Sequence, residues 1–455
     1  FEPMITDLKT VMAREANPAL VALINAATAH DVDILIDEDG VSIGHGIGSQ
    51  TWAMIDIPAP KDVEWRALHD VPLAFITGTN GKTTTTRLCA AIAHLDGNVV
   101  GQTSTDMVKV GDDILDRGDY SGPGGARMAL RDKRVQFACL EVARGGILRR
   151  GLATRHARVA VVTNIANDHL GEYGIMTLAD LAQAKFAVAR ALLPDGILVL
   201  NADDSNIVDA TAHVSKRICW FSLDAKSPQI TQAQMLGQPC AYLQDDVLVY
   251  WTGTEDAWEI PLKDVPITLS GAAKHNMRNA LAAICACSAL GIGAETIQKG
   301  LSAFVSDQQN NPGRFNEFSY NGARVIVDFA HNAHSVAAVC DATAQIPAKR
   351  RFLMLSQPGD HSDHAIGEVT TNALEFRPDL IVTAEIADHL RGRLLGETTG
   401  VIRASAVAAG FSGDNIMAAS SPSVGTKIIL DKLKPDDHAL LLVLSDRDAV
   451  FQSLA

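Results

Sequence analysis

Short runs of consecutive apolar residues alternate with longer amphipathic stretches through the middle of the chain. The clearest runs cover residues 71–76, 137–141, 159–163 and 197–200. Runs without polar alternation are typical of strands buried on both faces, and helices between them supply the crossovers of a parallel sheet. The pattern therefore predicts an α/β domain whose parallel sheet is covered by helices on both faces.

The same theme returns after residue 308, with apolar runs at 325–327, 352–355, 380–383 and 439–444. This predicts a second, smaller α/β domain. Asn310-Asn311-Pro312-Gly313 has the turn chemistry of a linker. A more irregular stretch at 217–268 predicts antiparallel strands inserted in or appended to the first sheet.

The first seventy residues read as a small entry module. We expect a helix over 18–28 and short strands at 33–36 and 41–43. The Gly-rich stretch at 44–49 is expected to be a turn, because no helical run follows it as a phosphate loop requires. The expected domains are therefore 1–70, 71–308 and 309–455.

Composition narrows the function classes. The 455 residues carry a net charge of −14, so no basic field favours a nucleic-acid partner. There is no run of eighteen apolar residues and no signal peptide, which predicts a cytoplasmic protein without a membrane span. The seven cysteines form no C-x-x-C pair and are expected to be buried apolar side chains in a reducing compartment. Because the sequence begins at Phe1, native residues are expected upstream of it.

The strongest local motif follows the run at 71–76 and opens a helical stretch at 84–94. In a phosphate loop, glycines let backbone amides converge on phosphate oxygens, and the helix N-terminus adds partial positive charge. Lys82 would supply a full charge and the Thr83 hydroxyl could hold magnesium. Ile76 stands where the general pattern has glycine, so this is not the common GTPase or helicase form. The motif reads Thr77-Gly78-Thr79-Asn80-Gly81-Lys82-Thr83.

The form T-G-T-N-G-K-T, with further blocks in the same order, resembles the Mur ligase superfamily and within it most the Mur-ligase-like half of cyanophycin synthetases. The resemblance runs from about residue 71 to the end. It departs at Ala333 and His361, and residues 1–70 are too short for the ATP-grasp domain of cyanophycin synthetases. The other blocks are Ser121-Gly122-Pro123, Ala126-Arg127-Met128, Glu141 to Arg149, Thr163 to Leu170, His275-Asn276, Pro312 to Phe315 and Asp328 to Asn332.

The resemblance implies an ATP-dependent, magnesium-dependent ligase that joins a carboxylate to an amine through an acyl phosphate. It implies magnesium ligation by Thr83, Glu141, His169 and Lys185, with His169 on a second magnesium ion and the lysine modified by carbon dioxide to a carbamate. From the residues alone, Glu141 could be a loop carboxylate and Lys185 a solvated helix lysine. Asp168 could orient His169. The implied catalytic residues are Lys82, Lys185, His169 and Arg314.

The implied nucleotide contacts come from both predicted domains. His275 and Asn276 would lie near the adenine and phosphates, although a polar group there could also cap the following helix. Arg314 would reach the γ-phosphate, and Asp328 would bind the ribose with His331 nearby. The full set is Thr79, Asn80, Gly81, Lys82, Thr83, Thr84, His275, Asn276, Arg314, Asp328 and His331.

Candidate substrate residues are charged groups near these blocks. Arginine in a cleft suits a carboxylate, and acidic groups would suit a cationic amino acid. We expect small amino-acid or peptide substrates, and a homo-oligomer is left open. The candidates are Asp119, Ser121, Arg127, Arg144, Arg149 and Asp360.

Three other interpretations of the sequence differ in substrate or in class of protein. A folylpolyglutamate-type or peptidoglycan-type ligase would use the same ATP chemistry on another acceptor. A non-catalytic ATP-binding regulatory subunit is favoured only by the departures at Ala333 and His361. A nucleic-acid motor is disfavoured by the loop form and the acidic balance.

Overall fold

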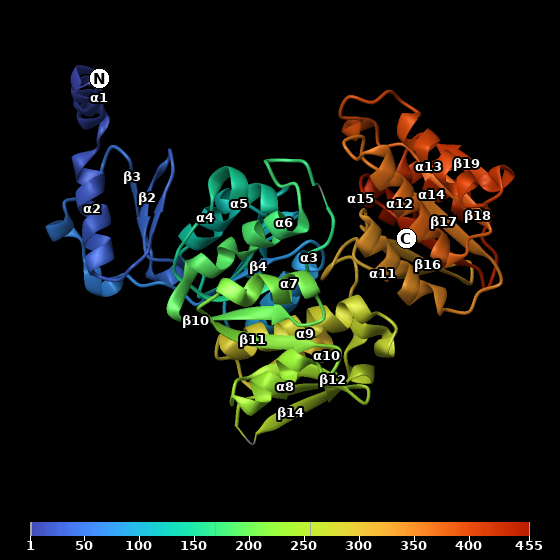
Figure 1. Ribbon diagram of the computed structural model, residues 1–455, viewed down its shortest axis with the longest axis horizontal. Helices are drawn as coiled ribbons and strands as arrows, with labels where there is room; N and C mark the ends of the chain where they lie inside the picture. The colour runs from blue at the N-terminus through green and yellow to red at the C-terminus, as the bar shows by residue number, and fades with distance from the viewer. Residues whose placement is uncertain (1, 169, 255, 455) are drawn as a thin grey trace.

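The computed structural model describes residues 2–168, 170–254 and 256–454. Three sheets of 3, 11 and 6 strands follow one another along the chain. They lie within residues 1–70, 71–308 and 309–455, and Figure 1 shows the three parts side by side in that order. The predicted α/β fold with a large, mostly parallel central sheet is confirmed.

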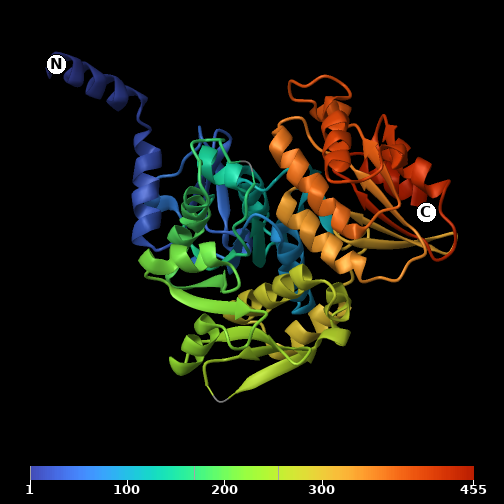
Figure 2. The ribbon, with the colours of Figure 1, turned by 45° about the vertical axis from the view of Figure 1, so that its right-hand side comes forward.

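The N-terminal module pairs a helix with a small antiparallel sheet. Strands β1 (Ile34–Ile36), β2 (Gly40–Ile43) and β3 (Gln50–Ala53) form the sheet, and α2 (Pro18–Ala29) buries Leu23 against it. A further helix, α1 (Glu2–Glu15), is not among the predicted elements and projects away from the body (Figure 2).

The central sheet has parallel strands in its middle and antiparallel strands at both ends. The order is β14-β13-β12-β11-β10-β9-β4-β8-β5-β6-β7. The expectation for 217–268 is partly right: β12, β13 and β14 pair antiparallel, but β11 pairs parallel with β10 and β12. The strands are β4 (Leu73–Thr77), β5 (Val100–Thr103), β6 (Met107–Val110), β7 (Asp113–Arg117), β8 (Phe137–Glu141), β9 (Ala157–Val162), β10 (Leu192–Asn201), β11 (Arg217–Ser222), β12 (Cys240–Gln244), β13 (Val247–Trp251) and β14 (Ala257–Pro261).

Alternate side chains of the buried strands pack against helices on opposite faces, which explains their unbroken apolar sequence. Ile76 packs with α3 and α9 on one face, whereas Phe75 packs with α4 and α6 on the other. All seven cysteines are buried and unpaired, as predicted. The helices are α3 (Lys82–Leu95), α4 (Pro123–Arg131), α5 (Arg144–Arg150), α6 (Leu178–Lys185), α7 (Ser205–Ala210), α8 (Pro228–Met235), α9 (Lys274–Ala289) and α10 (Ala294–Ala303).

The C-terminal part repeats the layered plan on a smaller scale. Its sheet has the order β15-β16-β20-β17-β18-β19, parallel except for the edge pair β15–β16. The elements are β15 (Asn316–Tyr320), β16 (Ala323–Asp328), α11 (Ala333–Ala344), β17 (Arg351–Leu355), α12 (Asp363–Ala373), β18 (Leu380–Ala384), α13 (Glu397–Ala408), β19 (Ile416–Ala419), α14 (Pro422–Leu430), β20 (His438–Leu442) and α15 (Arg447–Leu454).

The C-terminal part lies against the edge of the central sheet where β4, β8 and β9 end. Helix α11 contacts α9, and the Lys274 amine pairs with the Asp341 carboxylate across the boundary at 3.1 Å. Carboxyl ends of parallel strands are where open α/β sheets bind ligands. The fold therefore places this edge at an interdomain boundary.

Candidate active site

The loop between β4 and α3 is shaped by two glycines. Gly78 has φ +147°, and a Cβ there would lie 1.9 Å from the Thr163 hydroxyl oxygen. Gly81 has φ +81°, and a Cβ there would lie 2.3 Å from the Asn279 amide oxygen. Helix α3 then begins at Lys82, two residues before the predicted start, and its N-cap residue, Gly81, has no side chain to cap the first N–H groups. This is the geometry of a phosphate-binding loop.

A first cavity of about 440 Å³ opens at this loop and lies between the central and C-terminal parts. The central part contributes the loop, the start of α3 and the start of α9, and the C-terminal part contributes residues around β16 and α11. All eleven residues predicted to contact the nucleotide line this cavity: Thr79, Asn80, Gly81, Lys82, Thr83, Thr84, His275, Asn276, Arg314, Asp328 and His331.

Glu141, at the end of β8, lies deep beside the first cavity. It is 2 % exposed, and its Oε2 accepts a hydrogen bond from the Thr83 hydroxyl at 2.9 Å. Its Oε1 is buried and accepts no hydrogen bond from the described residues. Burial raises the pKa of this carboxyl, and the charge of Lys82 opposes that shift. A buried carboxylate oxygen without a donor, next to a hydroxyl, is the kind of ligand that Mg²⁺ prefers.

Lys185, the last residue of α6, is 3 % exposed, so it is not the solvated helix lysine of the alternative interpretation. Its amine donates a hydrogen bond to the Gly78 carbonyl at 2.7 Å. Burial, together with the charge of Lys82, holds the pKa of this amine well below its usual range. A neutral amine is the form that can react with carbon dioxide. His169, the remaining predicted metal ligand, lies outside the described residues.

A second cavity of about 440 Å³ lies on the other side of the phosphate loop. Lys82 lines both cavities, and its amine donates to the Thr79 carbonyl at 2.8 Å. Arg144 pairs with the Glu172 carboxylate at 2.6 Å at this cavity. The predicted residues that line it are Asp119, Ser121, Arg144 and Arg149, together with Lys185 and Asp168.

Two predicted substrate residues lie elsewhere. Arg127 and Arg131 stand four residues apart on one face of α4, and both pair with the Asp37 carboxylate of the N-terminal module, at 3.2 and 2.6 Å. Arg127 therefore joins two parts of the chain and lines neither cavity. Asp360 also lines neither cavity. Its charge is compensated by an ion pair with Arg391.

Two predicted nucleotide contacts also serve the local structure. The Asn276 amide donates to the Ile267 carbonyl at 3.0 Å, and the N-cap of α9 is Ala273, so Asn276 is not the helix cap of the alternative interpretation. Asp328 accepts hydrogen bonds from the backbone N–H groups of Phe315 and Ala330, both at 2.7 Å. Burial raises the pKa of Asp328 to about 6.

One contact between the phosphate loop and the C-terminal part has no signal in the sequence. The side-chain amides of Asn80 and Asn332 exchange hydrogen bonds at 3.2 and 2.9 Å, and Asn80 also contacts a ring nitrogen of His334. Asn332 caps α11 with a capping box, so its position is fixed. The phosphate loop is thereby joined directly to the C-terminal part. The residues are 252 apart in sequence, and no local pattern connects them.

Comparisons with known proteins agree with this geometry. Residues 76–287 match the Mur ligase middle domain, and residues 313–442 match the Mur ligase glutamate ligase domain. A cyanophycin synthetase from Nostoc sp. is 35% identical over 350 residues, which are 77% of this chain and 38% of that protein. The chain thus spans less than half of such relatives.

Solved structures share the fold. MurF from Acinetobacter baumannii superposes with a TM-score of 0.59 at 19% identity, covering 84% of this chain and 76% of that one. A bifunctional folylpolyglutamate synthase/dihydrofolate synthase with Mn, AMPPNP and L-glutamate bound gives a TM-score of 0.60 at 19% identity, covering 84% and 89%. In the described residues, no helix has the length and apolar character needed to cross a membrane.

Proposed function

Since the chain belongs to the Mur ligase family, we propose that it is an ATP-dependent ligase that joins a carboxylate to an amine through an acyl phosphate. The observation that carries the proposal is the position of Lys82, which lines both cavities. A cation between two sites is suited to stabilising a phosphoryl group that passes from one to the other.

The first cavity is the proposed ATP site. Its loop amides, Lys82 and the start of α3 would hold the phosphates, and Arg314 would neutralise charge on the transferring group. The neutral ring of His275, whose pKa burial lowers to about 4, suits an uncharged adenine. Asp328 would accept from the ribose in addition to its two backbone donors.

Magnesium is the proposed metal, with Thr83, Glu141 and carbamylated Lys185 among its ligands and His169 on a second ion. Among the described residues no group of three or more His, Cys, Asp or Glu side chains is arranged for a metal. The set therefore depends on the Thr83 hydroxyl and on conversion of the Lys185 amine into an anion. When bound, the metal supplies positive charge at the phosphates.

The second cavity is the proposed acceptor site. Arg144 and Arg149 would bind carboxylates of an amino acid or peptide, with Asp119 and Ser121 beside them. The acceptor carboxylate would attack the γ-phosphorus, forming an acyl phosphate and releasing ADP. The incoming amine would then attack the acyl carbon, lose a proton and displace phosphate, leaving the amide. Closure of the C-terminal part over the first cavity would exclude water from the acyl phosphate.

The substrate pair is an amino acid added to an amino-acid or peptide carboxylate, as in cyanophycin-type synthesis. The alternative acceptors are those of folylpolyglutamate-type and peptidoglycan-type ligases. All three use the same ATP chemistry, and the arginines of the second cavity suit any acceptor with free carboxylates.

The test is phosphate release from ATP with magnesium, using a matrix of acidic acceptors against amino acids, with the product identified by mass spectrometry. Release that needs one acceptor and one amine, together with a new amide, would support the ligase. Lys82→Ala should abolish release, whereas Lys299→Ala, an exposed lysine on α10 paired with Glu295, should not change it. Nucleotide binding without turnover for any pair would favour a regulatory subunit.

A further inference from the structure

One half-buried carboxylate lies at the boundary between the central and C-terminal parts and lines neither cavity. Asp106 follows β5 in the turn before β6, and its side chain is 15% exposed. Its Oδ2 accepts from Arg87 on α3 at 2.6 Å, and its Oδ1 accepts from Arg447 at 2.7 Å. Because Arg447 is the first residue of α15, the carboxylate joins an element of the central part to one of the C-terminal part.

The same two arginines hold the linker that connects these parts. Arg87 donates to the Asn311 amide oxygen at 3.2 Å, and the Asn311 amide donates to the Thr84 hydroxyl at 3.3 Å. Arg447 approaches the Pro312 carbonyl at 3.4 Å. Two adjacent linker residues, Asn311 and Pro312, are therefore each bonded to an arginine that pairs with Asp106.

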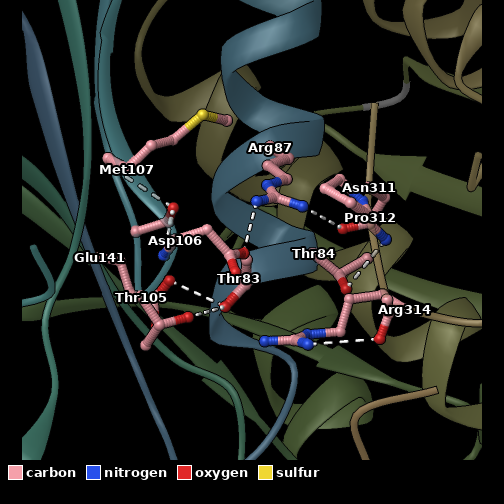
Figure 3. A network of polar contacts seen from close by, with 12 residues as sticks. Thr83, Thr84, Arg87, Thr105, Asp106, Met107, Glu141, Asn311, Pro312 and Arg314 are labelled. Atoms are coloured by element: carbon pink, nitrogen blue, oxygen red, sulfur yellow. Dashed lines mark hydrogen bonds and ion pairs between the residues drawn. The ribbon is translucent and has the colours of Figure 1, made fainter. Parts of the chain in front are cut away.

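Arg314 directly follows the linker and lines the first cavity. Its guanidinium lies over the Phe329 ring at 4.3 Å, and Figure 3 shows its side chain extending towards Thr83 and Thr105. The path of the backbone at 311–313 determines where this side chain begins. At Gly313, φ is +71° and an added Cβ would lie 2.9 Å from Arg447 Cδ, so that path is tightly packed.

Charge explains why an acid is needed at this point. Arg87 is 3% exposed, and burial lowers the pKa of its guanidinium to about 10, while the charge of Asp106 opposes that shift. Burial alone would raise the pKa of Asp106, but the charges of Arg314, Arg87 and Arg447 hold that pKa below its ordinary value. Without the carboxylate, three arginines would repel one another in a confined space.

We propose that Asp106 is a positioning residue: through Arg87 and Arg447 it clamps the interdomain linker and so holds Arg314 at the phosphate end of the first cavity. The role of Arg314 in turnover rests on the proposed function. The clamp itself is a statement about the geometry of the linker and can be tested without turnover.

The first variant is Arg447→Gln, because Arg447 is 24% exposed and its loss leaves the Arg87–Asp106 pair intact. We expect kcat to fall about tenfold or more, within the usual range of coupling between sites, with little change in the dissociation constant of a non-hydrolysable ATP analogue. The kcat of Asp106→Asn should fall at least as far as that of Arg447→Gln. The double variant should be no worse than Asp106→Asn, because the two residues act as one unit.

The matched control is Arg350→Gln. Arg350 pairs with Asp437 inside the C-terminal part and does not cross the boundary. A merely structural effect would lower the melting temperature in Arg350→Gln and Arg447→Gln alike without separating kcat from analogue affinity. Equal loss of kcat in the control, or independent and additive effects of Asp106→Asn and Arg447→Gln, would overturn the clamp.

Small-angle scattering with and without the analogue separates the clamp from the ligase proposal. We expect Arg447→Gln to have a larger radius of gyration than the wild-type protein without the analogue, because Arg447 joins the two parts in this structure. If the wild-type protein forms no amide but this difference appears, the clamp stands and the ligase proposal fails. If the two proteins have the same radius of gyration with and without the analogue, the clamp is wrong whatever the activity. Should Asp106→Asn fail to fold because Arg87 is left uncompensated, Arg447→Gln carries the test alone.

Discussion

Replacing Lys185 should separate activity from stability more sharply than any other change at the site. The side chain is buried, donates one hydrogen bond to Gly78 and lies within electrostatic reach of Lys82. In Lys185→Met the lost hydrogen bond costs about 1 kcal/mol, and removal of a buried amine offsets part of that. We therefore expect the free energy of unfolding to change by no more than about 1–2 kcal/mol.

Activity should fall much further if Lys185 is a carbamate. Two opposite unit charges about 4 Å apart interact by about 4 kcal/mol at an effective dielectric constant near 20. Loss of a carbamate beside a bound cation would then lower kcat by about 10³-fold. A plain lysine, which is cationic or neutral, would not hold a cation at all.

The assay is amide formation in buffer depleted of carbon dioxide, with and without added bicarbonate. Wild-type activity should fall on depletion and return with bicarbonate. Lys185→Ala, which leaves space beside the loop, should be partly rescued by formate or acetate. Lys216→Met is the matched control, because Lys216 also donates to backbone carbonyls, of Leu192 and Leu193, but lines neither cavity. Full activity in Lys185→Met, or bicarbonate dependence in the absence of Lys185, would refute the reasoning.

Three further predictions concern contacts around the site. Glu141→Gln should raise the magnesium concentration needed for half-maximal activity at least about tenfold without lowering the melting temperature, as measured by magnesium titration and calorimetry. Asn332→Ala should raise KM for ATP, and it also removes a helix cap worth about 1 kcal/mol. Asn332→Ser keeps a cap, so a rise in KM that persists in the serine variant reports loss of the Asn80 contact. A hydrogen bond to Asp70 raises the pKa of His156 in the folded protein. The stabilisation that protonated His156 gives is fully present below about pH 6.5 and is lost as pH rises through the folded-state pKa. His156→Gln should therefore shrink the difference in melting temperature between pH 6 and pH 8, and an unchanged difference would contradict this.

The sequence predicted the parts of the fold that depend on local pattern. The strand before the phosphate loop, the loop and its helix are consecutive in the chain, so apolar runs and glycine spacing were enough to identify them. Lys185 was placed by resemblance, because a single lysine in an amphipathic helix carries no local signal of burial. Its burial depends on how α6 packs near the loop, a tertiary fact.

The misses have the same physical origin. Arg127 looked like a substrate contact because an arginine near a glycine-rich block suits an anion, but the partner that compensates it, Asp37, is ninety residues away in sequence. Asp106 pairs with Arg447, 341 residues further on, and no composition rule connects them. Helix α1 was not predicted because an exposed helix needs no apolar face to pack against a core.

The position of Lys82 between the two cavities affects the order in which carbon dioxide and ATP should bind. The positive charge of Lys82 helps to keep the Lys185 amine neutral. Phosphates arriving at Lys82 would cancel that charge and favour protonation of Lys185, which opposes reaction with carbon dioxide. Loading of the lysine should therefore be fastest before the nucleotide arrives. Protein first incubated with bicarbonate should form product at once when ATP is added. Protein first incubated with ATP should show a lag in product formation after bicarbonate is added.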